Sequence, residues 1–178
     1  MDDLTTPPPA RPPAPCLLLA WGNRSRGDDA LAPLLLDRIQ RWLIQQPASQ
    51  HRAVQCLEDQ QLQVEHVLDL QGRRAVLLID AAVGMSAPFS TMALTPCRDS
   101  SFTSHALSPQ ALLQVYQDVL GEVPPPCLLL GLRADQFGLD HPPTPQALAD
   151  LDLAEAWLRT WVQQNTAVEA AEPGAVTQ

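Results

Sequence analysis

Residues 16–43 run from a short apolar segment through a polar turn and two acids into an amphipathic stretch. The first six residues are typical of a buried strand, and a turn bounded by Gly22 and Gly27 follows. Apolar residues then recur at helical spacing, which predicts a helix with one apolar face. This order of strand, turn and helix predicts an α/β unit. Its two acids, Asp28 and Asp29, are then expected at the carboxyl end of the strand, where open α/β sheets bind ligands.

The alternation of apolar runs and amphipathic stretches continues along the chain. The unbroken apolar run 75–79 is typical of a central parallel strand that is covered on both faces. Together these patterns predict an α/β fold with a twisted, mostly parallel sheet of about five strands and helices on both faces. Further strands are predicted at 52–57, 91–96 (this one antiparallel) and 127–132, and further helices at 61–70, 108–120 and 144–162.

The ends of the chain differ from its middle in composition. Residues 1–14 are rich in proline and are expected to form a disordered tail, and residues 165–178 are expected to form a flexible tail. Residues 15–164 are then one α/β domain.

Composition narrows the class of partner and the compartment. The net charge of −9 disfavours nucleic acid or an anionic membrane as a partner. None of the four cysteines forms a CxxC pair, and neither a signal peptide nor an apolar run of about 20 residues is present. We therefore expect a reduced, cytoplasmic, soluble protein, and we expect it to be a monomer.

Two common chemistries fit the motifs poorly. Gly22 and Gly27 have the spacing of a phosphate-binding loop, but acids follow where that loop needs lysine and serine or threonine. The segment 84–88 resembles the serine-hydrolase elbow only in part, because proline replaces its last glycine. A serine or cysteine hydrolase nevertheless stays open, with Ser86 or Cys97 beside His105.

A metal-binding interpretation uses three other residues. Asp29 begins a helix after the first strand, Asp80 ends the central strand, and His105 precedes a later helix. Two carboxylates and an imidazole at one edge of a sheet would suit a borderline divalent cation. Without the cation, the carboxylates would repel each other and the pKa of one should rise. The alternatives are an ordinary first-turn acid, a turn residue and a solvated loop histidine.

The same residues resemble the signatures of a known family. Gly22-Asn23 and Gly27-Asp28-Asp29, then Asp80 after an apolar run, then His105 before Leu107-Ser108-Pro109, resemble the three motifs of the hydrogenase maturation endopeptidases. These proteases trim the C-terminus of the large subunit of nickel-iron hydrogenases. The match covers about residues 15–162 in the order and spacing of that family.

This resemblance implies a function and a site. The family's acid, aspartate and histidine contact nickel that is already inserted in the large-subunit precursor, and they correspond here to Asp29, Asp80 and His105. The nickel belongs to the substrate and acts as a checkpoint for cleavage, so no tightly bound cofactor of the enzyme itself is expected. Asp28 would support the loop. A non-catalytic chaperone that senses the metal in the same precursor would need the same ligands, and the sequence leaves that alternative open.

The chain also departs from the family's pattern. Many members carry glutamate at the position of Asp29 and glycine at that of Ala30, and many have Gly-Gly-Thr where residues 61–66 stand here. These differences resemble the branch that processes NAD-coupled hydrogenases. Glu65 and His66 could bind substrate or metal, or could lie on a solvated helix face.

Overall fold

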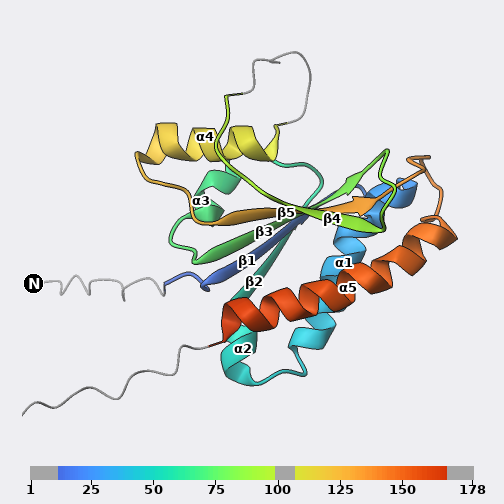
Figure 1. Ribbon diagram of the computed structural model, residues 1–178, viewed down its shortest axis with the longest axis horizontal. Coiled ribbons are helices and arrows are strands. Elements are labelled where there is room, and N and C mark those ends of the chain that lie inside the picture. Colours follow the sequence, from blue (N-terminus) through green and yellow to red (C-terminus); the bar gives the residue numbers. More distant parts are fainter. Residues whose placement is uncertain (1–11, 99–106, 168–178) are drawn as a thin grey trace, which may run out of the picture.

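Five strands form a single sheet in the order β2-β1-β3-β5-β4 (Figure 1). The computed structural model describes residues 12–98 and 107–167. The predictions for residues 1–11, for His105 and for residues 168–178 lie outside these ranges. β4 runs antiparallel to β5, and the other neighbours are parallel, which confirms the predicted sheet. The strands are β1 (Cys16–Trp21), β2 (Val54–Asp59), β3 (Ala75–Ala82), β4 (Phe89–Ala93) and β5 (Cys127–Arg133).

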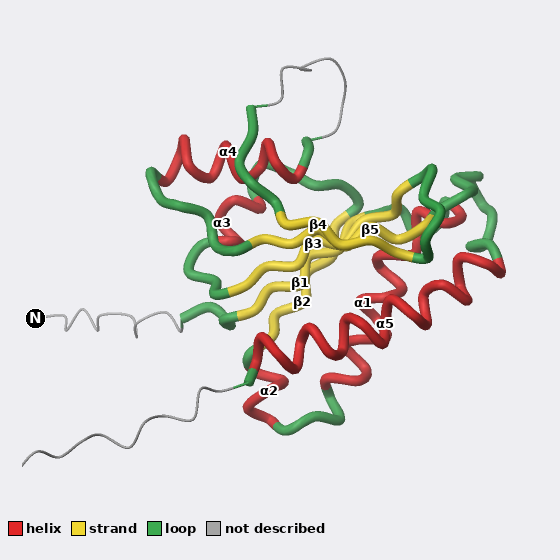
Figure 2. Tube along the Cα trace, in the orientation of Figure 1, coloured by secondary structure: helices red, strands yellow, loops and turns green. Residues whose placement is uncertain are grey.

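Helices cover both faces of the sheet, as predicted (Figures 1 and 2). Helices α1 (Leu31–Leu43) and α5 (Pro145–Thr166) pack together on one face. The short α3 (His66–Leu70) and α4 (Pro109–Leu120) cover the other. Each central strand therefore faces two cores, and its side chains alternate between them. This explains why β1 and most of β3 are apolar at every position.

The helix ends follow from capping residues that the sequence shows. The hydroxyl of Ser108 accepts a hydrogen bond from the amide of Ala111 at 3.1 Å, and that of Thr144 accepts one from Ala147 at 3.2 Å. In both helices a proline occupies the first turn. Gly121 ends α4 in the left-handed conformation, with φ of 65°. These are the boundaries that the sequence predicts.

Several boundaries differ from the prediction. The strand expected at 52–57 lies at 54–59, and the one expected at 75–79 extends to 82. The helix expected at 61–70 covers only 66–70, because the residues before it form a turn around the ring of His66. The strand expected at 91–96 lies at 89–93. The short α2 (Ala48–Arg52) was not predicted, since it buries no residue and so has no apolar stripe. α5 extends to Thr166, two residues into the expected tail, because Thr166 is buried and its hydroxyl donates to Val162 at 2.7 Å.

All four cysteines lie in the described ranges and are free thiols. None of the helices in those ranges combines the length and the apolar character needed to cross a membrane.

Candidate functional site

Asp29 lies in a tight turn whose backbone approaches Gly22 so closely that no other residue fits there. It belongs to the 3-10 turn η1 (Gly27–Ala30), between β1 and α1. The amide of Asn23 donates to the carboxylate of Asp29 at 3.1 Å. Gly22 has φ of +149°, and a Cβ there would lie 2.1 Å from the carbonyl oxygen of Asp29. The glycine of the motif therefore has a structural cause, since any side chain would push this acid out of place.

The neighbouring acid, Asp28, is wholly buried and holds two distant segments together. Its carboxylate accepts main-chain hydrogen bonds from Asp135 (2.9 Å), Gln136 (3.0 Å) and Thr144 (2.6 Å), and one from the hydroxyl of Thr144 (3.2 Å). Burial alone would raise the pKa of Asp28, but the hydrogen bonds from Asp135, Thr144 and Gln136 hold that pKa below its ordinary value. The structure thus confirms that Asp28 supports the loop.

Asp80 and Asp29 form an acid pair at the carboxyl edge of the sheet. The pKa of Asp80 is raised to about 6, chiefly by burial and to a smaller extent by the negative charge of Asp29. The amide of Ala81, which donates to Asp80 at 2.8 Å, and a hydrogen bond with Trp21 oppose the rise. The sequence predicted that repulsion between two uncompensated carboxylates would raise the pKa of one of them. The pKa of Asp80 is raised as expected, but burial is the main cause and the charge of Asp29 adds to it. The contribution of Trp21 was not predicted, since a tryptophan that ends an apolar strand signals only a core residue.

The third predicted residue, His105, lies outside the described residues. Within residues 12–98 and 107–167, no group of three or more histidine, cysteine, aspartate or glutamate side chains could hold a metal ion. The structure therefore brings together the two acids of the predicted trio, and the joint site with His105 stays a prediction.

Glu65 and His66, whose role was left open, differ in their surroundings. Glu65 is exposed, whereas His66 is 8% exposed. The Nδ1 atom of His66 accepts a hydrogen bond from the amide of Gln63 at 2.9 Å, and its Nε2 lies 3.5 Å from a carboxylate oxygen of Asp59. Nε2 therefore carries the proton of the neutral ring. His66 is thus not on a solvated face: it braces the segment after β2, and both of its ring nitrogens are occupied.

The alternative nucleophiles lie on exposed loops. Ser86 is exposed, and its carbonyl accepts a hydrogen bond from Arg133 at 3.3 Å. Cys97 is also exposed, and its thiol lies 3.8 Å from the carbonyl of Arg98. These contacts orient neither the hydroxyl nor the thiol for catalysis. Their pairing with His105 lies outside the described residues.

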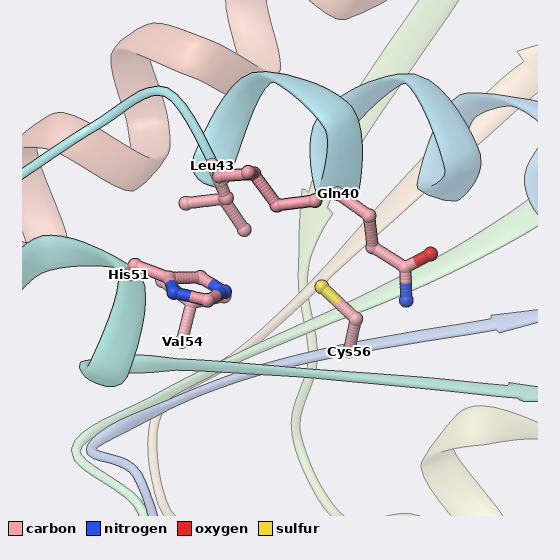
Figure 3. A pocket seen from close by; sticks show the side chains of 6 residues that line it. Gln40, Leu43, His51, Val54 and Cys56 are labelled. Carbon is pink, nitrogen blue, oxygen red and sulfur yellow. The ribbon is translucent and has the colours of Figure 1, made fainter. Parts of the chain in front are cut away.

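A hollow of about 310 Å³ opens between the end of α1, α2 and β2 (Figure 3). Figure 3 shows the ring of His51 and the thiol of Cys56 at its wall. It adjoins the start of β2, whereas the acid pair lies where the parallel strands end, so the two are at opposite edges of the sheet. Burial raises the pKa of Cys56 to about 12, which keeps the thiol protonated and unreactive. The lining residues are Gln40, Leu43, Ile44, His51, Val54 and Cys56.

The chain has the fold of the nickel-iron hydrogenase maturation proteases. HycI of Thermococcus kodakarensis matches with a TM-score of 0.65 and 18% identity, over 84% of this chain and 93% of the other. HybD of Escherichia coli matches with a TM-score of 0.62 and 21% identity, over 84% and 92%. A hydrogenase 2 maturation peptidase from Thaumarchaeota archaeon SCGC_AB-539-E09 matches with a TM-score of 0.57 and 17% identity, over 83% and 97%.

Comparisons with models of protein families and with curated proteins found no match. The structural likeness extends over most of this chain and nearly all of each neighbour, so it confirms the predicted resemblance in fold. Assignment to the NAD-coupled branch stays a prediction.

Proposed function

We propose that this protein is an endopeptidase that removes the C-terminal extension of a nickel-loaded hydrogenase large-subunit precursor. The observation that carries the proposal is the acid pair of Asp29 and Asp80, with its raised pKa, at the carboxyl edge of the sheet. The shared fold with proteins named hydrogenase maturation proteases supports the same activity.

The acid pair is suited to a cation that arrives with the substrate. A pKa of about 6 leaves most of Asp80 ionised at neutral pH, so two negative charges face one another. Nickel in the precursor would relieve that repulsion, and His105 would complete the ligand set as the family resemblance implies. A water held by a carboxylate or by the substrate's nickel would then attack the scissile bond. The protein needs no resident cofactor for this chemistry.

We also propose a setting for this reaction. The protein would act in the cytoplasm, as a monomer that meets its substrate transiently. The departures from the family pattern around Ala30 and residues 61–66 favour a precursor of the NAD-coupled branch.

Intact-mass spectrometry of the nickel-loaded precursor tests the activity. The native protein should shorten the precursor by its extension, and Asp80→Ala should leave the mass unchanged while keeping a native circular dichroism spectrum. Ser86→Ala and Cys97→Ala are matched controls that should cleave at the native rate. A stable complex without cleavage by the native protein would replace the protease with a chaperone. Loss of cleavage in either control would instead assign a serine or cysteine hydrolase.

A further inference from the structure

Strand β4 forms one edge of the sheet (Figures 1 and 2). Within the described residues it pairs with β5 alone, in an uninterrupted antiparallel register of five residue pairs. Four of its five residues are exposed, and only Phe89 is partly buried. The strand is thus joined to the sheet along one side.

The hydrogen bonds at the two ends of this ladder identify the outward-facing main-chain groups. The carbonyl of Pro88 accepts from an amide of β5 at 3.0 Å, and the amide of Leu94 donates to β5 at 2.9 Å. Because residues of an antiparallel strand alternate between facing toward and away from the partner, Ser90 and Met92 also face β5. The N–H and C=O groups that face outward belong to Phe89, Thr91 and Ala93.

Nothing in the strand's sequence protects this edge. Natural sheets block exposed edges with charged side chains, proline, a bulge or a covering segment. The sequence Phe-Ser-Thr-Met-Ala contains neither a charge nor a proline, and its register has no bulge. At the other edge, β2 ends in Glu58 and Asp59. An unprotected edge of this kind is the surface to which extended peptides add as a further strand.

The register relates this edge to the acid pair. Asp80 of β3 lies opposite Gly131 of β5, and Gly131 lies opposite Ser90 of β4, so the three form one row across the sheet. A strand added to β4 would lie three strand spacings from Asp80, or about 14–15 Å. An extended peptide covers that distance with about four or five residues. One peptide could therefore reach the acid pair and the edge at the same time.

We propose that the precursor's C-terminal extension adds to β4 as a sixth strand, beginning about five residues from the bond that is cut. This rests on the proposed function, since it assumes cleavage at the acid pair. A second copy of this chain is a poorer occupant, because two chains of net charge −9 repel one another.

Two substitutions at one position separate the main chain from the side chain. Thr91→Pro removes an outward N–H and places a ring on the open edge, while the hydrogen bonds to β5 remain. Thr91→Val keeps that N–H and loses only the hydroxyl. With the nickel-loaded precursor from the same organism, we expect kcat/KM of Thr91→Pro to fall by about tenfold or more, mainly through KM. Thr91→Val should stay within about twofold of the native protein.

Two further measurements test the geometry. In the native protein, the amides of Thr91 and Ala93 should exchange at least about tenfold more slowly when the uncleaved precursor is bound. A precursor whose extension is shortened to about three residues cannot reach β4, so Thr91→Pro and Thr91→Val should process it equally. The hydrogen-exchange measurement uses the native protein, so it tests the proposal even if Thr91→Pro folds poorly.

The outcomes of these experiments separate failure of the sixth-strand proposal from failure of the proposed protease function. Native cleavage with equal kcat/KM for both variants and no slowed exchange would overturn the sixth strand and leave the protease intact. Slowed exchange that depends on protein concentration without precursor would assign the edge to a second copy and overturn the proposal. If the native protein neither binds nor cleaves the precursor, both the function and the sixth strand are wrong.

Discussion

Asp28 and Asp29 are adjacent in the sequence but differ in burial and in the number of hydrogen bonds that they accept. The carboxylate of Asp28 is wholly buried and accepts four hydrogen bonds. The carboxylate of Asp29 accepts one from Asn23, is only half buried, and raises the pKa of Asp80. A satisfied carboxylate stabilises a fold, whereas two carboxylates in mutual repulsion store free energy that a ligand can release.

The raised pKa of Asp80 makes stability depend on pH. Unfolded aspartate has a pKa of about 3.9, and the folded value is about 6, so the folded state binds the proton more tightly. The free energy of unfolding therefore falls as pH rises from about 4 to 6, and the loss persists above 6. Asp80→Asn removes this term and should be more stable than the native protein by roughly 1–3 kcal/mol at pH 8, with the difference shrinking toward pH 4.

Urea unfolding at pH 4 and pH 8 measures this difference. Asp135→Asn, at an exposed position, is the matched control and should change little at either pH. An Asp80→Asn variant that is less stable than the native protein at pH 8 would show that Asp80 is a stabilising residue and not a strained one.

Asp28→Asn should have the reverse effect. The amide group that replaces the carboxylate would face main-chain N–H groups, so one or two buried donors would lose their acceptor. We expect a loss of roughly 2–4 kcal/mol in the free energy of unfolding. Because the pKa of Asp28 is lowered, its contribution is present at neutral pH and is lost as the pH falls below the unfolded value.

Thermal or urea unfolding at pH 7 is sufficient for this test, with Asp29→Asn as the matched control. That neighbour accepts a single hydrogen bond and should lose about 1 kcal/mol or less. Equal losses in the two variants would contradict the separate roles.

The sequence located the acids but not their partners. The spacing between Gly22 and Asp29 and the apolar run before Asp80 placed two acids at the carboxyl edge of the sheet, because local turn chemistry and strand ends are readable from neighbours in the chain. The family resemblance was needed to select them over an ordinary first-turn acid and a turn residue. The hydrogen bonds of Asp28 join it to residues more than 100 positions away. Such contacts depend on how loops meet in space, and no local pattern encodes them.

Among the elements, the strands and long helices were predictable and the short pieces were not. β1 and α1 carry strong apolar patterns. In contrast, α2 buries no residue, and α3 is only five residues long. The ring of His66 replaced the first turn expected of α3 by accepting the amide of Gln63. A side chain that competes for main-chain donors in this way overrides helical periodicity.

A largely buried ion pair joins α5 to the sheet, in addition to the apolar face of the helix. Arg133 of β5 contacts Asp150 of α5, which is 5% exposed and also accepts a hydrogen bond from Gln146 at 3.0 Å. Arg133→Ala would leave the buried carboxylate without its counter-charge and should cost roughly 3–5 kcal/mol. Asp150→Ala should cost a similar amount.

A double-mutant cycle separates the pair from its surroundings. Removing both partners leaves no unpaired charge, so the double variant should be about as stable as either single variant. Additive losses in the double variant would show that Arg133 and Asp150 act independently, and α5 would then be held by its apolar face alone.

For the molecule as a whole, the topology places the acid pair and the start of β4 at the carboxyl edge of the sheet. The parallel strands β1 and β3 end at the acid pair, and the open edge of β4 begins in the same row of the sheet. The net charge of −9 disfavours anionic partners and is compatible with the metal-bearing substrate that we propose.

The dependence of cleavage on nickel decides whether the acid pair works as proposed. The native protein should be mixed in parallel with nickel-loaded and nickel-free precursor, and the fraction shortened should be followed by intact mass. We predict cleavage of the loaded precursor only, and no cleavage of either form by Asp29→Ala or Asp80→Ala. Equal cleavage of both forms by the native protein, or normal cleavage by the two variants, would contradict the proposed role of the acid pair.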